Sequence, residues 1–261
     1  MMATESIIIS ITDAIATITL NRSEKRNAMN GQMIQALSNA LHDLSSADDV
    51  RVLLIHGSGE HFCAGADIDW MQKIAAGSYN DNYDDAQYLS DLMYQLYSFP
   101  KPTIVLAQGA TLGGGLGLLS ACDIAIAAKN AIFGFSEVKI GITPSTISPY
   151  VIAAIGERMA HYYFLTGERF GTESANQMGL IHQITENDAL FNTGLSIANV
   201  LLKNGPKALI AAKQLIRHVA REKITEELAQ KTAEHLANLR SSPEAQEGLL
   251  SFIEKREPTW R

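Results

Sequence analysis

The spacing of apolar residues predicts a mixed fold for the first half of the chain. Segments 6–12 and 15–20 are short and rich in β-branched residues, which is typical of two neighbouring strands. Residues 31–45 carry apolar side chains at helical spacing, and 52–55 form a short apolar run typical of a buried strand. Further short strands broken by glycine follow up to about residue 140. This alternation of strand and helix predicts an α/β fold.

The pattern changes in two places. Residues 77–85 (GSYNDNYDD) are polar, acidic and rich in turn formers, so we expect a surface loop there. From about residue 146 to 255 the periodicity predicts almost only helices. We therefore divide the chain into a core, residues 1–200, and a C-terminal helical region, residues 201–261. The many apolar positions of that region indicate that it packs on the core or on another subunit.

Composition narrows the possible partners and location. The chain has 261 residues, 46% hydrophobic and 19% charged, as expected of a globular protein with a buried core. Its net charge of −7 disfavours a nucleic-acid partner, because phosphate neutralisation needs clustered Lys and Arg. The two cysteines, Cys63 and Cys122, form no disulfide framework, so we expect a reducing, cytoplasmic location. We expect neither a signal peptide nor a membrane-spanning segment.

A run of glycines in residues 112–123 (LGGGLGLLSACD) needs a physical reason, because glycine is unfavourable within helices and strands. A tight turn with close packing is one explanation. A degraded dinucleotide fingerprint over 115–120 is a second, with Glu137 as its acidic partner. The third is that backbone N–H groups at the start of a helix over 114–121 approach a ligand oxygen closely.

The third explanation gains support from a second turn of the same kind. Residues 61–67 (HFCAGAD) follow a buried strand, turn at small residues and enter a helix near Asp67. Two such turns could direct two N–H groups at one oxygen, which is an oxyanion hole built from main chain.

Three segments carry a resemblance to a known family. They are HFCAGADIDWM (61–71), GATLGGGLGLLSACDIAIAA (109–128) and FGFSEVKIGITPS (133–145). They resemble the signature stretches of the crotonase superfamily, also called the enoyl-CoA hydratase/isomerase family. The similarity runs from NRSEKRNAMN (21–30) to EGLLSFIEKREPTW (247–260). The resemblance implies a spiral of ββα turns with C-terminal helices that form a trimer, two of which often stack into a hexamer. It implies an acyl-CoA substrate, no metal, and no cofactor beyond the coenzyme A of the substrate.

The same resemblance assigns roles to individual residues. It implies that the N–H groups of Ala66 and Gly114 hold the thioester oxygen and stabilise an enolate, and that Glu137 is a catalytic acid or base. Losing one such donor typically costs about 2.7–4 kcal/mol. The residues that match positions along the coenzyme A path within the same chain are Ala28, Lys25, Arg26, Ala64, Ala66, Asp67, Ile68 and Gly114. Phe252 and Lys255 match C-terminal positions that often reach the coenzyme A of a neighbouring subunit.

One position departs from the family pattern. Hydratases of this family usually carry two glutamates; the second matches Glu137, and Gly117 stands where the first would be. A water or another side chain could do the missing work, or one carboxylate could suffice. We also expect the glycine to leave a hole beside position 117 that could admit a bulkier or branched acyl group.

The reaction expected from the sequence is a hydration. Residues 136–170 resemble the branch that hydrates branched glutaconyl-type CoA esters, such as 3-methylglutaconyl-CoA in leucine degradation. The alternatives are a Δ3,Δ2-enoyl-CoA isomerase that uses one glutamate, a decarboxylase of a malonyl-type CoA, and a non-catalytic acyl-CoA-binding or RNA-binding protein. Intact positions 66, 114 and 137 argue against an inactive site, and the net negative charge argues against RNA.

Overall fold

The computed structural model describes residues 5–261; residues 1–4, which begin the segment examined for a signal peptide, lie outside the described residues. The strands are β1 (Ile7–Thr12), β2 (Ile15–Leu20), β3 (Val52–Gly57), β4 (Thr103–Ala107), β5 (Ala110–Leu112), β6 (Ile124–Ala128), β7 (Ile132–Gly134), β8 (Arg169–Gly171) and β9 (Gln183–Thr185). The helices are α1 (Gly31–Ser46), α2 (Ile68–Ala75), α3 (Tyr79–Ser98), α4 (Gly114–Ala121), α5 (Ser148–Thr166), α6 (Thr172–Gln177), α7 (Leu190–Leu202), α8 (Pro206–Val219), α9 (Glu226–Arg240) and α10 (Pro243–Glu254). Three short 3-10 turns are η1 (Ser23–Lys25), η2 (Glu137–Ile140) and η3 (Asn187–Ala189).

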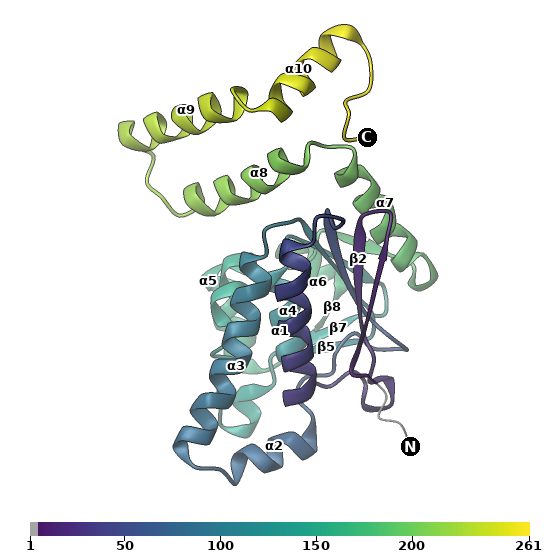
Figure 1. The fold of residues 1–261 in the computed structure, drawn as a ribbon. Coiled ribbons are helices and arrows are strands. Elements are labelled where there is room, and N and C mark those ends of the chain that lie inside the picture. Colours follow the sequence, from purple (N-terminus) through teal and green to yellow (C-terminus); the bar gives the residue numbers. More distant parts are fainter. Residues whose placement is uncertain (1–4) are drawn as a thin grey trace.

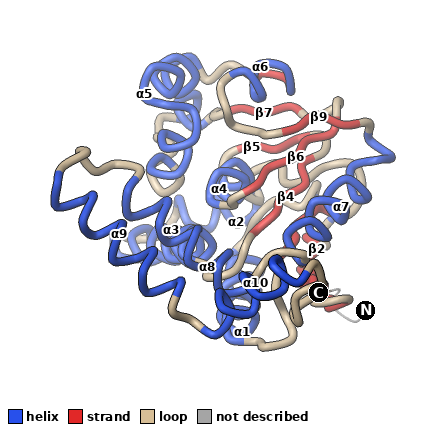
Figure 2. The backbone as a smooth tube through the Cα atoms, turned by 90° about the horizontal axis from the view of Figure 1, so that it is seen from above, coloured by secondary structure: helices blue, strands red, loops and turns tan. Residues whose placement is uncertain are grey.

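Two sheets organise the core. The larger has the order β1-β2-β3-β4-β6-β9, in which β1 and β2 are antiparallel and the following pairs are parallel. The smaller has the order β5-β7-β8, with β5 parallel to β7 and β8 antiparallel to it. Figure 2 shows these strands between α3, α4 and α5 on one side and α7 on the other. The predicted α/β class is confirmed.

Alternation along β3 explains how both faces of the sheet are covered. Leu53 and Ile55 belong to the apolar cluster shared with α1, α3 and α4, whereas Val52 and Leu54 belong to the cluster shared with α7. Successive side chains of a strand point to opposite faces, so a continuous apolar run serves two helical layers. The carboxyl end of β3 is thereby fixed between these layers, and the turn over residues 61–67 follows it.

Helices α8, α9 and α10 lie together at one end of the molecule, beyond the sheet (Figure 1). An ion pair links them to the core: Nζ of Lys213, on α8, lies 2.6 Å from Oδ2 of Asp123, which follows α4. The same carboxylate oxygen accepts hydrogen bonds from the N–H and hydroxyl of Thr103 at the start of β4. The boundary that we place near residue 200 stays a prediction, because α7 packs on the sheet and α8 begins at residue 206.

One expectation about secondary structure is wrong and another is incomplete. Residues 77–85 are not a loop, because α3 begins at Tyr79; Ser78 caps it and forms a capping box with Asp81. The polar side chains of this stretch face solvent, so composition resembled a loop although the N-cap chemistry is that of a helix start. The region after residue 146 is not only helical, because it contributes β8 and β9, each three residues long. Such short strands carry too little periodicity to be recognised.

Helices in the described part of the chain, residues 5–261, lack the combination of length and apolarity that crossing a membrane requires.

Candidate active site

The two small-residue turns predicted from the sequence lie side by side. The N–H of Cys63 donates to the carbonyl oxygen of Ala110 at 3.1 Å, and the N–H of Leu112 donates to that of Cys63 at 2.9 Å. Cys63 and Thr111 are thereby paired in parallel. Ala66 and Gly114 each lie three residues beyond this pair. The backbone thus brings together two residues that are 48 positions apart in the sequence, since 114 − 66 = 48.

The N–H groups of Ala66 and Gly114 are both available to a ligand. Within residues 5–261 neither has a hydrogen-bond acceptor, although Asp67 donates to Met29 and Gly113 donates to Gly134. Ala66 is exposed, and Gly114 is half-buried at the first position of α4, where a helix leaves its N–H groups unsatisfied. The structure therefore provides two donors that an oxygen of a ligand could accept.

Glycines 113 and 115 allow this close approach. Gly113 has φ of +49°, a conformation that residues with a side chain rarely adopt. A Cβ at Gly113 would lie 3.3 Å from Oε1 of Glu137, and one at Gly115 would lie 2.8 Å from the carbonyl oxygen of Cys63. A side chain at 115 would therefore push the two turns apart.

Glu137 places a carboxyl group beside these donors. It is the first residue of η2, and it is half-buried, two residues after the buried Phe135. Its Oε2 is buried and has no hydrogen-bond partner among the residues that the structure describes. Burial raises the pKa of the Glu137 carboxyl above its usual value, because desolvation disfavours the charged form. A raised pKa makes a carboxyl better suited to both taking up and returning a proton.

The expectation of a hole beside Gly117 is wrong. A Cβ built at Gly117 would overlap Cγ2 of Ile147 and would lie 2.9 Å from Sδ of Met93. Ile147 is 2% exposed and Met93 is fully buried, so the space is occupied by core side chains. Sequence reasoning missed this because both residues are distant in the chain and were assigned no role at the site.

Asp67, one of the residues expected along the coenzyme A path, already has partners within the chain. Its Oδ2 lies 2.8 Å from a guanidinium nitrogen of Arg22, and its Oδ1 accepts from the N–H groups of Asp69 and Trp70 at the start of α2. Arg22 also donates to the carbonyl oxygen of Ala28 at 2.6 Å. Arg22 was not predicted, and its position in the NRSEKRNAMN segment is the signal that could have identified it.

The other predicted residues of these two loops line the same region. The N–H of Ala64 donates to the carbonyl oxygen of Arg26, which ties the turn over 61–67 to η1. Nζ of Lys25 lies 3.0 Å from Oδ2 of Asp69, and this hydrogen bond raises the pKa of the Lys25 ammonium. Ile68, at the start of α2, is 71% exposed. These contacts join the loop over residues 21–30 to the turn over 61–67 and the start of α2; Ala28 and Asp67 are buried within this junction, and Lys25 and Ile68 are exposed.

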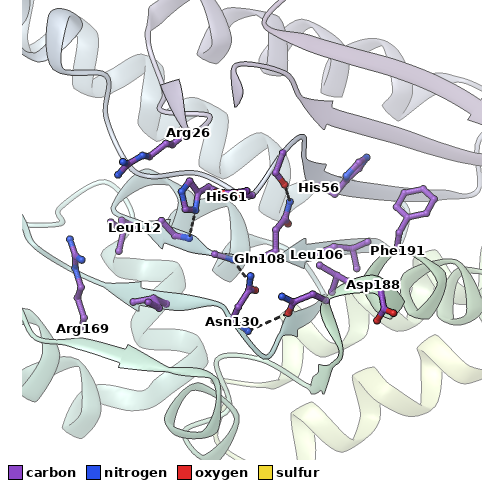
Figure 3. Close-up of a pocket in the computed structure, with 17 residues that line it drawn as sticks. Arg26, His56, His61, Leu106, Gln108, Leu112, Asn130, Arg169, Asp188 and Phe191 are labelled. Carbon is purple, nitrogen blue, oxygen red and sulfur yellow. Dashed lines mark hydrogen bonds between the residues drawn. The ribbon is translucent and has the colours of Figure 1, made fainter. Parts of the chain in front are cut away.

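The side chain of Arg26 lies on a different side of the turn. It lines a cleft of about 790 Å³ together with His61, Leu112 and Arg169 (Figure 3). Nδ1 of His61 accepts a hydrogen bond from the N–H of Ala110, so the imidazole holds the start of β5. This cleft is adjacent to Leu112, one residue before the glycine run.

Phe252 and Lys255 are not brought to the site within one chain. Both belong to the end of α10 and are exposed, Phe252 to 83%. Figure 1 shows α10 and α2 at opposite ends of the molecule. A role for these two residues near the substrate would require a second copy of the chain.

Comparisons with known proteins agree with this geometry. The model of the enoyl-CoA hydratase/isomerase family matches residues 10–261. The crystal structure of an enoyl-CoA hydratase from Shewanella pealeana is 40% identical, covers 98% of this chain and 96% of its own, and gives a TM-score of 0.95. The 2,3-dehydroadipyl-CoA hydratase of Escherichia coli is 31% identical over 257 residues, which are 98% of each chain. The mevalonyl-coenzyme A hydratase sidH of Aspergillus fumigatus is 31% identical over 253 residues, 96% of this chain and 92% of that protein.

The match extends over almost the whole chain and includes both turns and Glu137. The fold of the chain is that of the solved crotonase structures, and the relatives named above are hydratases of CoA esters. The resemblance inferred from the three sequence segments is therefore confirmed, and the chain belongs to the enoyl-CoA hydratase/isomerase family, the crotonase superfamily, as an acyl-CoA enzyme of the enoyl-CoA hydratase type.

Proposed function

We propose that the protein hydrates a 2,3-enoyl-CoA with Glu137 as its only catalytic carboxylate. The observation that carries this proposal is the unpartnered, buried Oε2 of Glu137, next to the donor turn that ends at Gly114. In this proposal the N–H groups of Ala66 and Gly114 donate hydrogen bonds to the thioester oxygen. Metal ligands and redox groups have no part in it.

A single carboxylate can complete the reaction in two steps. Glu137 takes a proton from water while the water oxygen bonds to C3, and the electrons of the C2–C3 double bond move to the thioester oxygen. The resulting enolate is held by the two N–H groups, which bind the developing charge more strongly than the neutral carbonyl. Glu137 then returns the proton to C2. The product carries one hydroxyl at C3 and one added hydrogen at C2, so the atoms of one water are accounted for.

The raised pKa of Glu137 supports this shuttle. A general acid–base group works best when its pKa lies near the working pH, since it must both accept and return the proton. Burial shifts the Glu137 carboxyl in that direction. Proton transfer by such a group typically contributes about 10²–10⁴-fold to the rate.

The substrate class that we propose is an enoyl-CoA branched at C3, such as 3-methylglutaconyl-CoA. Residues 136–170 support it through their resemblance to that branch of the family. The space at Gly117 gives no support, because Ile147 and Met93 fill it.

A Δ3,Δ2-enoyl-CoA isomerase is the second candidate. The apolar packing beside Gly117 favours it, because no second carboxylate can stand there and an isomerase needs only one. In that reaction Glu137 removes a proton from C2 and returns it at C4, and the same two N–H groups hold the enolate.

Binding of coenzyme A and assembly complete the proposal. We propose that the two loops that carry Lys25, Ala28, Ala64 and Ile68 receive the coenzyme A portion, and that the chain forms trimers or hexamers. In such an assembly Phe252 and Lys255 would approach the substrate of a neighbouring subunit, which is the arrangement that their distance from α2 within one chain requires (Figure 1).

The test compares three substrates under identical conditions. Purified protein is incubated with 3-methylglutaconyl-CoA, crotonyl-CoA and a 3-enoyl-CoA, and products are identified by mass spectrometry. We expect addition of one water to the first substrate, a loss of at least a hundredfold in Glu137→Gln, and no loss in the exposed control Glu157→Gln. Conversion of the 3-enoyl ester without water addition would replace hydration by isomerisation. Full activity of Glu137→Gln would disprove both.

A further inference from the structure

Gly117 lies one helical turn beyond the donor turn, in the direction in which an acyl group held at Gly114 would extend along α4. Its N–H donates to the carbonyl oxygen of Gly113 at 3.2 Å, so the two glycines are consecutive along α4. The Cβ direction of Gly113 meets Oε1 of Glu137, whereas that of Gly117 meets Ile147 and Met93. An acyl group whose thioester oxygen is held at Gly114 has C3 only three bonds away. Its substituents therefore lie between the Glu137 side and the Ile147 side.

Ile147 is held firmly in this position. It is the N-cap of α5, and its carbonyl oxygen accepts from the N–H groups of Tyr150 and Val151. Its side chain is branched at Cβ, which restricts χ1 and fixes where Cγ2 points. Met93, on α3, contacts the same place with its flexible thioether end. Of the two, the isoleucine is thus the less able to move aside.

We propose that Ile147 is a specificity-determining residue, because its Cγ2 closes the space beside Gly117 and sets how large a C3 substituent the acyl site accepts. The proposal rests on the proposed function in one respect: it takes the thioester to be held at Ala66 and Gly114. The proposal also explains why residue 117 is glycine, since any Cβ at 117 would occupy the volume that Cγ2 of Ile147 already fills.

The expected effect is large enough to measure. One methylene more or less in an apolar pocket changes discrimination by about 10–200-fold. Ile147→Ala removes Cγ2 with the rest of the branch, whereas Ile147→Val keeps Cγ2 and removes only the terminal carbon. The two variants therefore separate the contact that we propose from a general loss of volume.

The measurement is binding of two saturated esters, butyryl-CoA and 3-methylbutyryl-CoA, by isothermal titration calorimetry. These esters cannot be hydrated, so turnover does not enter. We expect the affinity ratio of branched to linear ester to rise at least tenfold in Ile147→Ala and to change less than twofold in Ile147→Val. The control is Ile155→Ala, a buried isoleucine further along α5, which should leave the ratio unchanged.

Several outcomes would overturn the proposal. They are an unchanged ratio in Ile147→Ala, an equal change in Ile155→Ala, or a change in Ile147→Val as large as that in the alanine variant. Should Ile147→Ala fail to fold, Ile147→Leu conserves volume but lacks Cγ2, and we expect at least a threefold rise in the same ratio. A shifted ratio in a protein that hydrates no enoyl-CoA would reject the proposed function and leave this inference standing.

Discussion

Gly113 and Gly117, one turn apart at the start of α4, have different neighbours and need glycine for different reasons. At Gly113 the neighbours are polar and incompletely satisfied, with the carboxylate of Glu137 3.3 Å from where a Cβ would lie. At Gly117 the neighbours are apolar and tightly packed, Ile147 and Met93. Both residues belong to the same glycine-rich motif. The first keeps room for a ligand and the second keeps room for the core.

The difference teaches that a glycine run should be interpreted residue by residue. Unpaired donors and an unpaired carboxyl are unfavourable in a folded chain unless a ligand completes them. Dense apolar packing is what the interior normally has. On the Gly113 side, polar groups among residues 5–261 are therefore left without hydrogen-bond partners, whereas the Gly117 side is apolar and fully packed. Changes on the first side should alter the rate of the reaction, and changes on the second should alter stability and, at Ile147, the size of acyl group that is accepted.

Glu137→Gln, on the Gly113 side, should have the largest effect on catalysis. It keeps the shape of the side chain but removes its ability to accept and return a proton. We expect kcat/KM for the preferred enoyl-CoA to fall by about 10²–10⁴-fold. Steady-state kinetics measure the loss, and calorimetric titration with the matching saturated ester should show binding within a few-fold of the unchanged protein. A kcat/KM close to that of the unchanged protein would refute the role of this carboxyl.

Gly113→Ala tests the room on the polar side. Residue 113 has a positive φ, which is strained for alanine, and the new Cβ would approach Glu137. The donor at Gly114 should therefore shift relative to the carboxyl. Loss of one such donor typically reduces kcat by about 10²–10³-fold, which is the decrease we expect. The control is Gly156→Ala: Gly156 also has positive φ, 75°, but nothing lies within 4 Å of its Cβ. Equal losses in both variants would show that backbone strain, not proximity to Glu137, is responsible.

Gly117→Ala tests the packing on the apolar side. Overpacking a dense core typically destabilises by about 1–3 kcal/mol, so we expect a lower midpoint in urea unfolding. The double variant Gly117→Ala with Ile147→Ala should lose less stability than the sum of the two single variants, because the smaller residue vacates the space of the new Cβ. Gly171→Ala is the matched control, since its Cβ would meet only a side-chain oxygen at 3.7 Å. Additive effects in the double variant would contradict the contact.

The smallest expected effect is on the pH dependence of stability, which Glu137 on the Gly113 side should alter. The pKa of Glu137 is raised, so the folded state favours its neutral form, and this carboxyl contributes stability at low pH that is lost as pH rises through the folded pKa. Glu137→Gln should therefore be slightly more stable than the unchanged protein at neutral pH and not in acid, as followed by urea unfolding at several pH values. In kinetics, the acid limb of kcat/KM should lie above the usual pKa of 4.5 and disappear in this variant.

Much of the fold could be predicted from the sequence because the responsible signals are local. The first two strands and α1 were placed to within a residue, since alternation and helical spacing extend over six or more positions. The start of α3 was missed because its capping box lies within an acidic, turn-rich stretch. Strands β8 and β9 were missed because three residues show no period.

The site divides in the same manner. Two tight turns and a following glutamate are local patterns, and the structure places the turns side by side with Glu137 against one of them. The packing at Gly117 depends on Met93 and Ile147, which lie 24 and 30 residues away, since 117 − 93 = 24 and 147 − 117 = 30. Volume that distant residues fill cannot be read from a single segment. For the same reason the partnership of Arg22 with Asp67 became visible only once the chain was folded.

Cys63 gives the molecule a built-in reporter. It is fully buried directly behind the glycine turn, with Sγ 3.2 Å from where a Cβ of Gly115 would lie, and burial raises the pKa of its thiol to about 11. A maleimide can reach this sulfur only when the two turns separate. The labelling rate at Cys63, assigned by peptide mass, therefore measures how often the two turns separate, and an acyl-CoA bound at these turns should slow it in proportion to its occupancy.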